Sequence, residues 1–380
     1  MTSFARTFRK SKKKVHFEDK RMENKKKCGW KIQLLITVFL LAAGVGLLWA
    51  SRKIGGFAEW YSCTVYPVLV NVIGRFWGIV PFSVVEFMLY GLIVLLLFWL
   101  IRDFRRPLVL ILNYTTTLAL ILFLYAACCG VNYYRVPFSS YYIAQIAKEQ
   151  ALPSTNLKEL CLWLTAEVNR ARGELDRAEG NYENIQQKGA AAMKRLAEQY
   201  PSLDGYYPKP KPLAISWILS VQQCSGVYSP FTIEANYNRD MTTYNIPHTI
   251  CHELSHLRGF MREDEANFIG YLACLGSEDA DYRYSGYLLG WIYAGNALAK
   301  VDYEAYNQLY SLLADPIIAD IEENSEFWDQ YEGEVAEVQE RVNDAYLKAN
   351  GQVHGVLSYG RVVDLMLIDF ACHRKTKMVE

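Results

Sequence analysis

Three long apolar stretches restrict the possible folds of this chain more than any other feature. Residues 32–50 (IQLLITVFLLAAGVGLLWA) carry no charge, and residues 84–101 and 107–129 contain a single charged residue between them, Glu86. A helix of about 20 apolar residues can cross the hydrocarbon core of a bilayer. The first stretch is also too long for the apolar core of a typical signal peptide. We therefore predict three membrane-spanning helices and a multi-pass protein of the cell membrane.

The charges beside these stretches predict an orientation. Lysine and arginine greatly outnumber acidic residues in the tail at 1–31, and the loop at 102–106 reads RDFRR. Basic segments next to membrane spans favour the cytoplasmic side, which places the chain from about residue 130 onward outside the cytoplasm. The tail either contacts anionic lipid headgroups or is solvated without a partner. Because it directly precedes an apolar helix, we expect the lipid bilayer and no nucleic acid as its partner.

Residues 51–83 are apolar but interrupted by Pro67, Gly74 and Pro81. We predict an amphipathic segment that lies in the membrane interface, where Trp60 and Trp77 suit the headgroup region. The alternative is a fourth span, which would invert the topology.

Residues 131–380 have the composition of a soluble domain with mainly helical periodicity. A capping box at Asn156–Glu159 begins a helix that extends to about 177, and a second helix covers 180–200. Residues 208–212 alternate proline and lysine and predict a stiff linker, and 213–238 predict strands. Helical patterns fill most of the remainder. The fold class expected is mainly α with a small β-sheet.

The sequence at 252–256, HELSH, contains the HExxH pattern. On a helix, His252 and His256 lie on one face and can reach one ion, with Glu253 beside them as a base. A catalytic Zn²⁺ usually has three protein ligands, so a third is expected downstream, from Glu263 or Glu265. These two lie about 200° apart around a helix, so only one can face the ion. The alternative is a surface helix with two histidines and a paired glutamate, but the apolar residues around the motif favour a packed helix.

The motif and the segment after it resemble the gluzincin zinc peptidases. Glu263-Asp264-Glu265-Ala266-Asn267 matches their E-x-x-A-D pattern except for Asn267, where aspartate is usual. The resemblance implies Zn²⁺ as cofactor, Glu263 as the third ligand, Asn267 as a partner of a ligand histidine, and an extracytoplasmic zincin-like α+β domain. Arg262 stands where the metzincin pattern requires a third histidine, which excludes that class. Most of the chain also resembles an uncharacterised family of bacterial membrane-anchored proteins with this HExxH segment, known only as a domain of unknown function.

Zinc peptidases stabilise the oxyanion of the reacting carbonyl with a residue from a separate loop. The polar, glycine-containing loop at 351–361 offers Tyr359, which we prefer, and His354 or Arg361. Pro247 places His248 near the start of the motif helix, as a cap or a neighbour of the site. Cys251 and Cys274 are expected to be buried free thiols.

Together these patterns predict a membrane-anchored zinc metallopeptidase that acts on a peptide or protein. Two alternatives stay open: a zinc-bearing envelope scaffold or sensor without activity, and a zinc hydrolase of non-peptide amide bonds. The strands at 213–238 either offer a free edge to a peptide substrate or simply cover the helices.

Overall fold

The computed structural model describes residues 29–149, 156–175, 184–352 and 361–374. These residues are mainly helical and contain one three-stranded sheet, which confirms the predicted class. The chain forms two compact units: the first contains residues up to Trp49 and Leu89–Ala127, and the second contains Ala50–Met88 and the chain from Cys128 onward.

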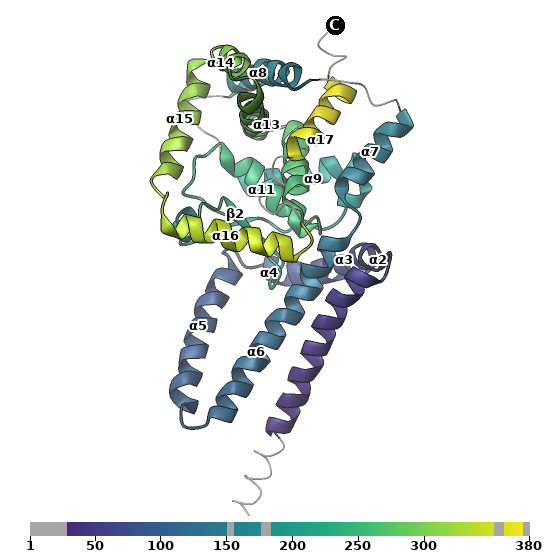
Figure 1. Cartoon of the computed structure of the whole chain (residues 1–380), viewed down its shortest axis with the longest axis vertical. Coiled ribbons are helices and arrows are strands. Elements are labelled where there is room, and N and C mark those ends of the chain that lie inside the picture. Colours follow the sequence, from purple (N-terminus) through teal and green to yellow (C-terminus); the bar gives the residue numbers. More distant parts are fainter. Residues whose placement is uncertain (1–28, 150–155, 176–183, 353–360, 375–380) are drawn as a thin grey trace, which may run out of the picture. The chain divides into compact units, whose positions relative to one another are not determined.

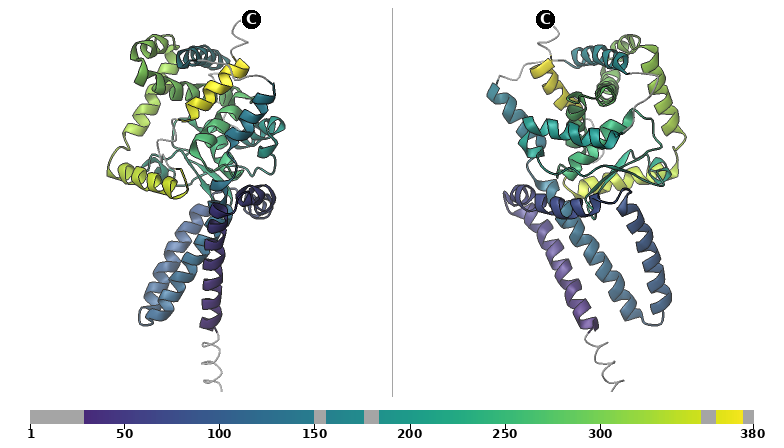
Figure 2. Two further views of the ribbon diagram at one scale, coloured as in Figure 1. Left: turned by 45° about the vertical axis from the view of Figure 1, so that its right-hand side comes forward. Right: turned by 180° about the vertical axis from the view of Figure 1, so that it is seen from behind.

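The first unit consists mostly of three apolar helices, whose ends at 50–53, 84–88 and 128 belong to the second unit. They span Gly29–Lys53, Val84–Asp103 (α5) and Pro107–Cys128 (α6), and each is long and apolar enough to cross a membrane. They run alongside one another in both views of Figure 2. Polar side chains in these helices bond to one another, since Gln33 Nε2 donates to Asn113 Oδ1 at 3.0 Å and the hydroxyls of Thr37 and Thr116 lie 2.7 Å apart. Such pairs supply the hydrogen bonds that these polar side chains cannot form with lipid tails.

The second unit is organised around two helices whose surfaces are almost wholly buried, α11 (Asn245–Leu257) and α12 (Glu263–Leu275). Every residue of α11 is buried except His252, and every residue of α12 except Glu263. Helix α13 (Ala280–Val301) packs against both. Figure 1 shows α11 inside the unit, with α13 and α9 near it.

Further helices complete this unit, and the predicted N-cap at Asn156 is confirmed. The side chain of Asn156 accepts a hydrogen bond of 2.8 Å from the backbone N–H of Glu159 at the start of α8. The other helices are α7 (Phe138–Glu149), α8 (Leu157–Glu174), α9 (Ile185–Gln199), α14 (Tyr303–Tyr310), α15 (Asp315–Asp329), α16 (Glu334–Ala349) and α17 (Arg361–Asp369). The short turns η2 (Gly130–Tyr134), η3 (Pro201–Leu203) and η5 (Phe370–Arg374) connect or extend them.

The sheet has the order β1-β3-β2. Its strands are β1 (Lys211–Pro212), β2 (Gly226–Ser229) and β3 (Glu234–Tyr237). β1 runs parallel to β3 and β2 antiparallel to it, with Val227 opposite Asn236, so β2 is an edge strand. The sequence predicted strands throughout 213–238, but the part around Trp217–Ser220 is helical (α10). Lys211 of the predicted linker is buried in β1 and paired with Glu234, because the linker adds to the sheet.

Residues 50–88 belong to the second unit, which therefore extends beyond the predicted range of 131–380. They form a nearly continuous helical segment: α2 (Phe57–Thr64), α3 (Tyr66–Leu69), the π-helical turn η1 (Val70–Gly74) and α4 (Arg75–Gly78). This segment is not one of the candidate spans found in the described residues.

Candidate metal centre

A tight turn brings the start of α12 back to the motif helix. Helix α11 ends at Leu257, and Gly259 follows with φ +89°, a left-handed conformation that glycine adopts without strain. A Cβ on Gly259 would also lie 3.2 Å from the guanidinium of Arg135. The chain then enters α12 at Glu263, directly beside His252 and His256 of α11.

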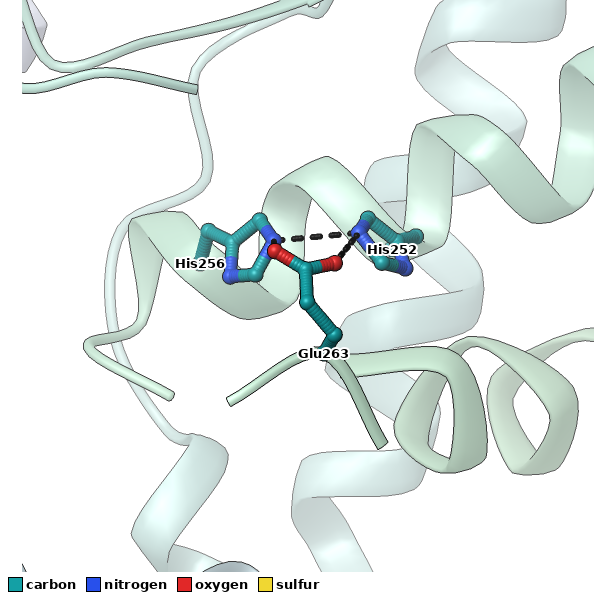
Figure 3. A group of neighbouring side chains, drawn as sticks. All are labelled: His252, His256 and Glu263. Atoms are coloured by element: carbon teal, nitrogen blue, oxygen red, sulfur yellow. Dashed lines mark hydrogen bonds and ion pairs between the residues drawn. The ribbon is translucent and has the colours of Figure 1, made fainter. Parts of the chain in front are cut away.

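Three side chains meet at this point: His252, His256 and Glu263 (Figure 3). The Nε2 atoms of the two histidines lie 3.0 Å apart. The Glu263 carboxylate reaches both, with Oε2 at 3.3 Å from His252 Nε2 and Oε1 at 3.6 Å from His256 Nε2. Tetrahedral Zn²⁺ with bonds of about 2.0–2.1 Å requires donor atoms about 3.3 Å apart. The donor set and its spacing therefore fit such an ion.

The second nitrogen of each imidazole fixes its tautomer. His252 Nδ1 lies 2.8 Å from Asn267 Oδ1, and His256 Nδ1 lies 2.8 Å from the carbonyl oxygen of Phe260. Both oxygens only accept, so both Nδ1 atoms carry hydrogen and both Nε2 atoms present lone pairs. Two lone pairs 3.0 Å apart beside a carboxylate require a cation between them, either a proton or a metal ion.

The pKa values of His256 and Glu263 are shifted by the contact between these two side chains. Burial alone would lower the pKa of His256, but the Glu263 carboxylate raises it to about 9. Burial alone would raise the pKa of Glu263, but its contacts with His256 and His252 hold it far below the usual range. The two shifts therefore describe an ion pair in which protonated His256 and ionised Glu263 stabilise each other.

Glu253 lies next to the cluster and is buried, with 4% of its surface exposed. Its Oε2 atom has no hydrogen-bond partner among the described residues. Burial raises the pKa of Glu253 to about 7, against the opposing effect of the two histidines. Strand β2 passes close to this carboxylate, since a Cβ on Gly226 would lie 2.6 Å from Glu253 Oε1. A buried carboxylate with an unused oxygen and a raised pKa is typical of a general base.

Glu265 has a different role from Glu263. Its carboxylate accepts hydrogen bonds from Phe138 N–H at 3.0 Å and from the Ser139 hydroxyl at 3.0 Å, at the start of α7. It therefore caps α7 and lies outside the cluster. Of the two alternatives left by the sequence, Glu263 is the carboxylate beside the histidines.

The cluster opens into a cleft of about 1300 Å³. One side of it is formed by α11, α12 and the edge strand β2 at Gly226–Tyr228. The other side is formed by the end of α15 and by α16. No lysine or arginine is found among the described residues that line the cleft, whereas Glu332, Glu337 and Glu340 are.

The structure places the other residues that the sequence singled out in different surroundings. Tyr359 and His354 lie outside the described residues. Arg361 lies 3.6 Å from Asp264 and does not line the cleft. His248 is buried, lines the cleft, and donates from Nε2 to the carbonyl oxygen of Asn267 at 3.1 Å, so it contacts the residue that orients His252. Cys251 and Cys274 are buried free thiols, as predicted.

Tyr293 of α13 is a cleft residue that the sequence did not indicate. Its hydroxyl lies 3.4 Å from Asn267 Oδ1, the atom that orients His252. Burial raises its pKa to about 12, so it is a neutral hydrogen-bond donor at neutral pH. No motif surrounds Tyr293, and only the packing of α13 against α12 brings it here.

Comparison with known proteins gives one match. A family model described as "Protein of unknown function (DUF3810)" matches residues 61–367. No curated protein and no solved structure matches the chain.

Proposed function

This chain belongs to the DUF3810 family, and we propose that it acts as a membrane-anchored zinc metallopeptidase. One observation carries the proposal: a buried glutamate, Glu253, has an unpartnered oxygen beside a cluster of two histidines and one carboxylate. His252, His256 and Glu263 would hold the ion. Bound Zn²⁺ would polarise a substrate carbonyl and lower the pKa of a water molecule to about 7.

Glu253 would move the protons of the reaction. Its free Oε2 atom offers a site for the proton of the attacking water, and its raised pKa allows the same carboxyl to deliver that proton to the leaving amine. Asn267 and the Phe260 carbonyl would keep both histidines in the tautomer that ligation requires. Tyr293 would offer a neutral hydrogen-bond donor in the cleft, beside the role proposed for Tyr359, which lies outside the described residues.

The cleft favours an extended peptide as substrate. Among the described residues, strand β2 pairs on one side only, and it lines the cleft beside Glu253. An extended peptide can add to such an edge through main-chain hydrogen bonds. The basic loop at 102–106 supports a cleft on the extracytoplasmic side of the membrane.

The substitution Glu253→Gln tests the proposal. It keeps the size of the side chain but removes the base, so we expect peptide hydrolysis to fall by about 10²–10⁴-fold while zinc content is retained. Hydrolysis of a peptide library by purified full-length protein in lipid nanodiscs measures this. A matched control is Glu334→Gln, an exposed residue of α16 that does not line the cleft.

Three results are decisive. A Glu253→Gln protein as active as the parent would refute the mechanism. A parent that binds zinc but cleaves no peptide in the library would instead favour a silent scaffold. Hydrolysis of non-peptide amides alone would favour the remaining alternative.

A further inference from the structure

The helical segment at 57–79 presents apolar side chains on two opposite faces. Ala58, Tyr61, Tyr66 and Val70 are buried, and they recur at spacings of three to five residues along one side. The opposite side carries large apolar residues that are 54–82% exposed: Trp60, Val68, Val72, Phe76 and Ile79. Spacings of three and four residues place side chains on one face of a helix. This exposed row is referred to below as the outer face.

The buried side of the segment is fixed to the elements of the metal centre. The hydroxyl of Tyr66 donates to the carbonyl oxygen of Leu257, the last residue of α11, at 2.9 Å. It also lies 2.8 Å from the hydroxyl of Tyr228 on the edge strand β2. The Lys211 ammonium in turn donates to the Trp77 carbonyl at 2.9 Å. The segment therefore cannot turn its outer face inward without moving the motif helix.

The exposed apolar side chains of the outer face indicate that another molecule or a membrane covers them. Contiguous exposed apolar surface of this kind is rare on soluble proteins and marks contact with a protein or a membrane. A helix that is apolar on both sides, with one side already packed, leaves the other side for that contact.

The position of the segment in the chain indicates that a membrane, rather than a protein, contacts the outer face. A helix long enough to span a membrane ends at Lys53, and the next begins at Val84. The segment begins at Phe57 and its outer face ends at Ile79, so about four or five residues, at most about 18 Å of chain, separate it from a span at each end. Val84 and Val85 at the start of α5 belong to the second unit, and their N–H groups donate to the Glu234 carboxylate at 3.2 and 3.0 Å.

A second apolar group lies next to the same helix start. The backbone N–H groups of Ala214 and Ile215 donate to the carboxylate of Glu86 at 2.7 and 2.9 Å. Ile215 and Trp217 are 47% and 57% exposed. Tryptophan is enriched at the headgroup level of membranes.

We infer that the outer face binds the surface of the lipid bilayer, so that the segment is an in-plane membrane helix. The motif helix and the edge strand then rest on a bilayer-bound element through Tyr66. The inference does not depend on zinc or on peptidase activity. If both proposals hold, the substrates are peptide segments close to the membrane surface.

Site-directed spin labelling of the full chain tests this inference. Val72→Cys carries the label on the outer face, and Val301→Cys is its matched control, since both valines are exposed (64% and 76%) and lie in the second unit. Both changes are made in a chain with Cys28→Ser and Cys63→Ser, because Cys63 is exposed and Cys28 lies outside the described residues. Val68→Cys repeats the test at a second position of the outer face. The labelled chains are studied in phosphatidylcholine–phosphatidylglycerol nanodiscs.

We expect the label at 72 to collide severalfold more with oxygen, which partitions into lipid, and severalfold less with a water-soluble nickel chelate than the label at 301. Equal access of the chelate to the labels at 72, 68 and 301 would overturn the inference. Spin–spin broadening at 72 that disappears on dilution with unlabelled chain would also overturn it, because a second copy would then be the cover.

Discussion

The two sides of the cleft are packed very differently. On one side, His252 and Glu263 are the only residues of α11 and α12 that are not buried. On the other side, Leu347 is the only buried residue of α16, and Val335 and Val342 are each 57% exposed. Figure 1 shows α16 at the outside of the unit. The proposed chemistry therefore lies on a rigid side, where side chains are held in place, and faces a side with little packing to resist local opening.

This difference predicts different effects of mutation. Changes on the rigid side should alter stability, metal affinity or rate by large factors. Changes on the α16 side should alter the choice of substrate by small factors and leave the fold intact.

The largest effect is expected from overpacking the rigid side. In Gly226→Ala the new Cβ would lie 2.6 Å from Glu253 Oε1 and 2.8 Å from Thr249 Cγ2. We expect a loss of about 3 kcal/mol in the free energy of unfolding, at the upper end for an extra methyl group in a packed site. Chemical denaturation measures it, with Gly55→Ala as the control because nothing lies within 4 Å of that position. Equal stability of the two variants would contradict a rigid contact between β2 and α11.

A smaller effect is expected at the residue that orients His252. Asn267→Ala removes the oxygen 2.8 Å from His252 Nδ1, and loss of such a partner typically lowers metal affinity by about 10–100-fold. Asn267→Asp keeps an acceptor there and should retain the affinity of the parent. Competition with a zinc-binding dye measures all three proteins. Unchanged affinity in the alanine variant would remove Asn267 from the site.

The smallest effect is expected on the α16 side. Glu337 and Glu340 line a cleft without described basic residues, so peptides with lysine or arginine should be preferred. An exposed charge pair contributes about 0.2–1 kcal/mol, so each change to glutamine should lower kcat/KM for a lysine-containing peptide by up to about fivefold. The ratio to a neutral peptide is the measurement. A uniform loss for both peptides would mean that these carboxylates do not select charge.

The three span-length apolar helices and the histidine pair could be predicted from the sequence because each depends on local pattern. An apolar run of span length needs no distant partner, and the spacing of His252 and His256 fixes their common face. Glu263 could not be distinguished from Glu265 by spacing alone. That choice depends on α7, which lies more than a hundred residues upstream and supplies the N–H groups that bind Glu265.

Other features depend on contacts that no local pattern encodes. Residues 50–88 pack within the second unit because Tyr66 bonds to Leu257 and Tyr228, each more than 160 positions away. The linker at 208–212 adds to the sheet because Lys211 finds Glu234. Tyr293 reaches the cleft only through the packing of α13, and its helix carries no signal for the site.

Zinc binding by paired variants tests the central claim most directly. The Zn²⁺ content and dissociation constant of the full-length protein are compared with those of Glu263→Gln and Glu265→Gln, two identical changes two residues apart. We predict one ion per parent chain, a large loss of affinity in Glu263→Gln, and parent-like affinity in Glu265→Gln. A parent that binds no divalent ion, or a loss confined to Glu265→Gln, would contradict the metal centre formed by His252, His256 and Glu263.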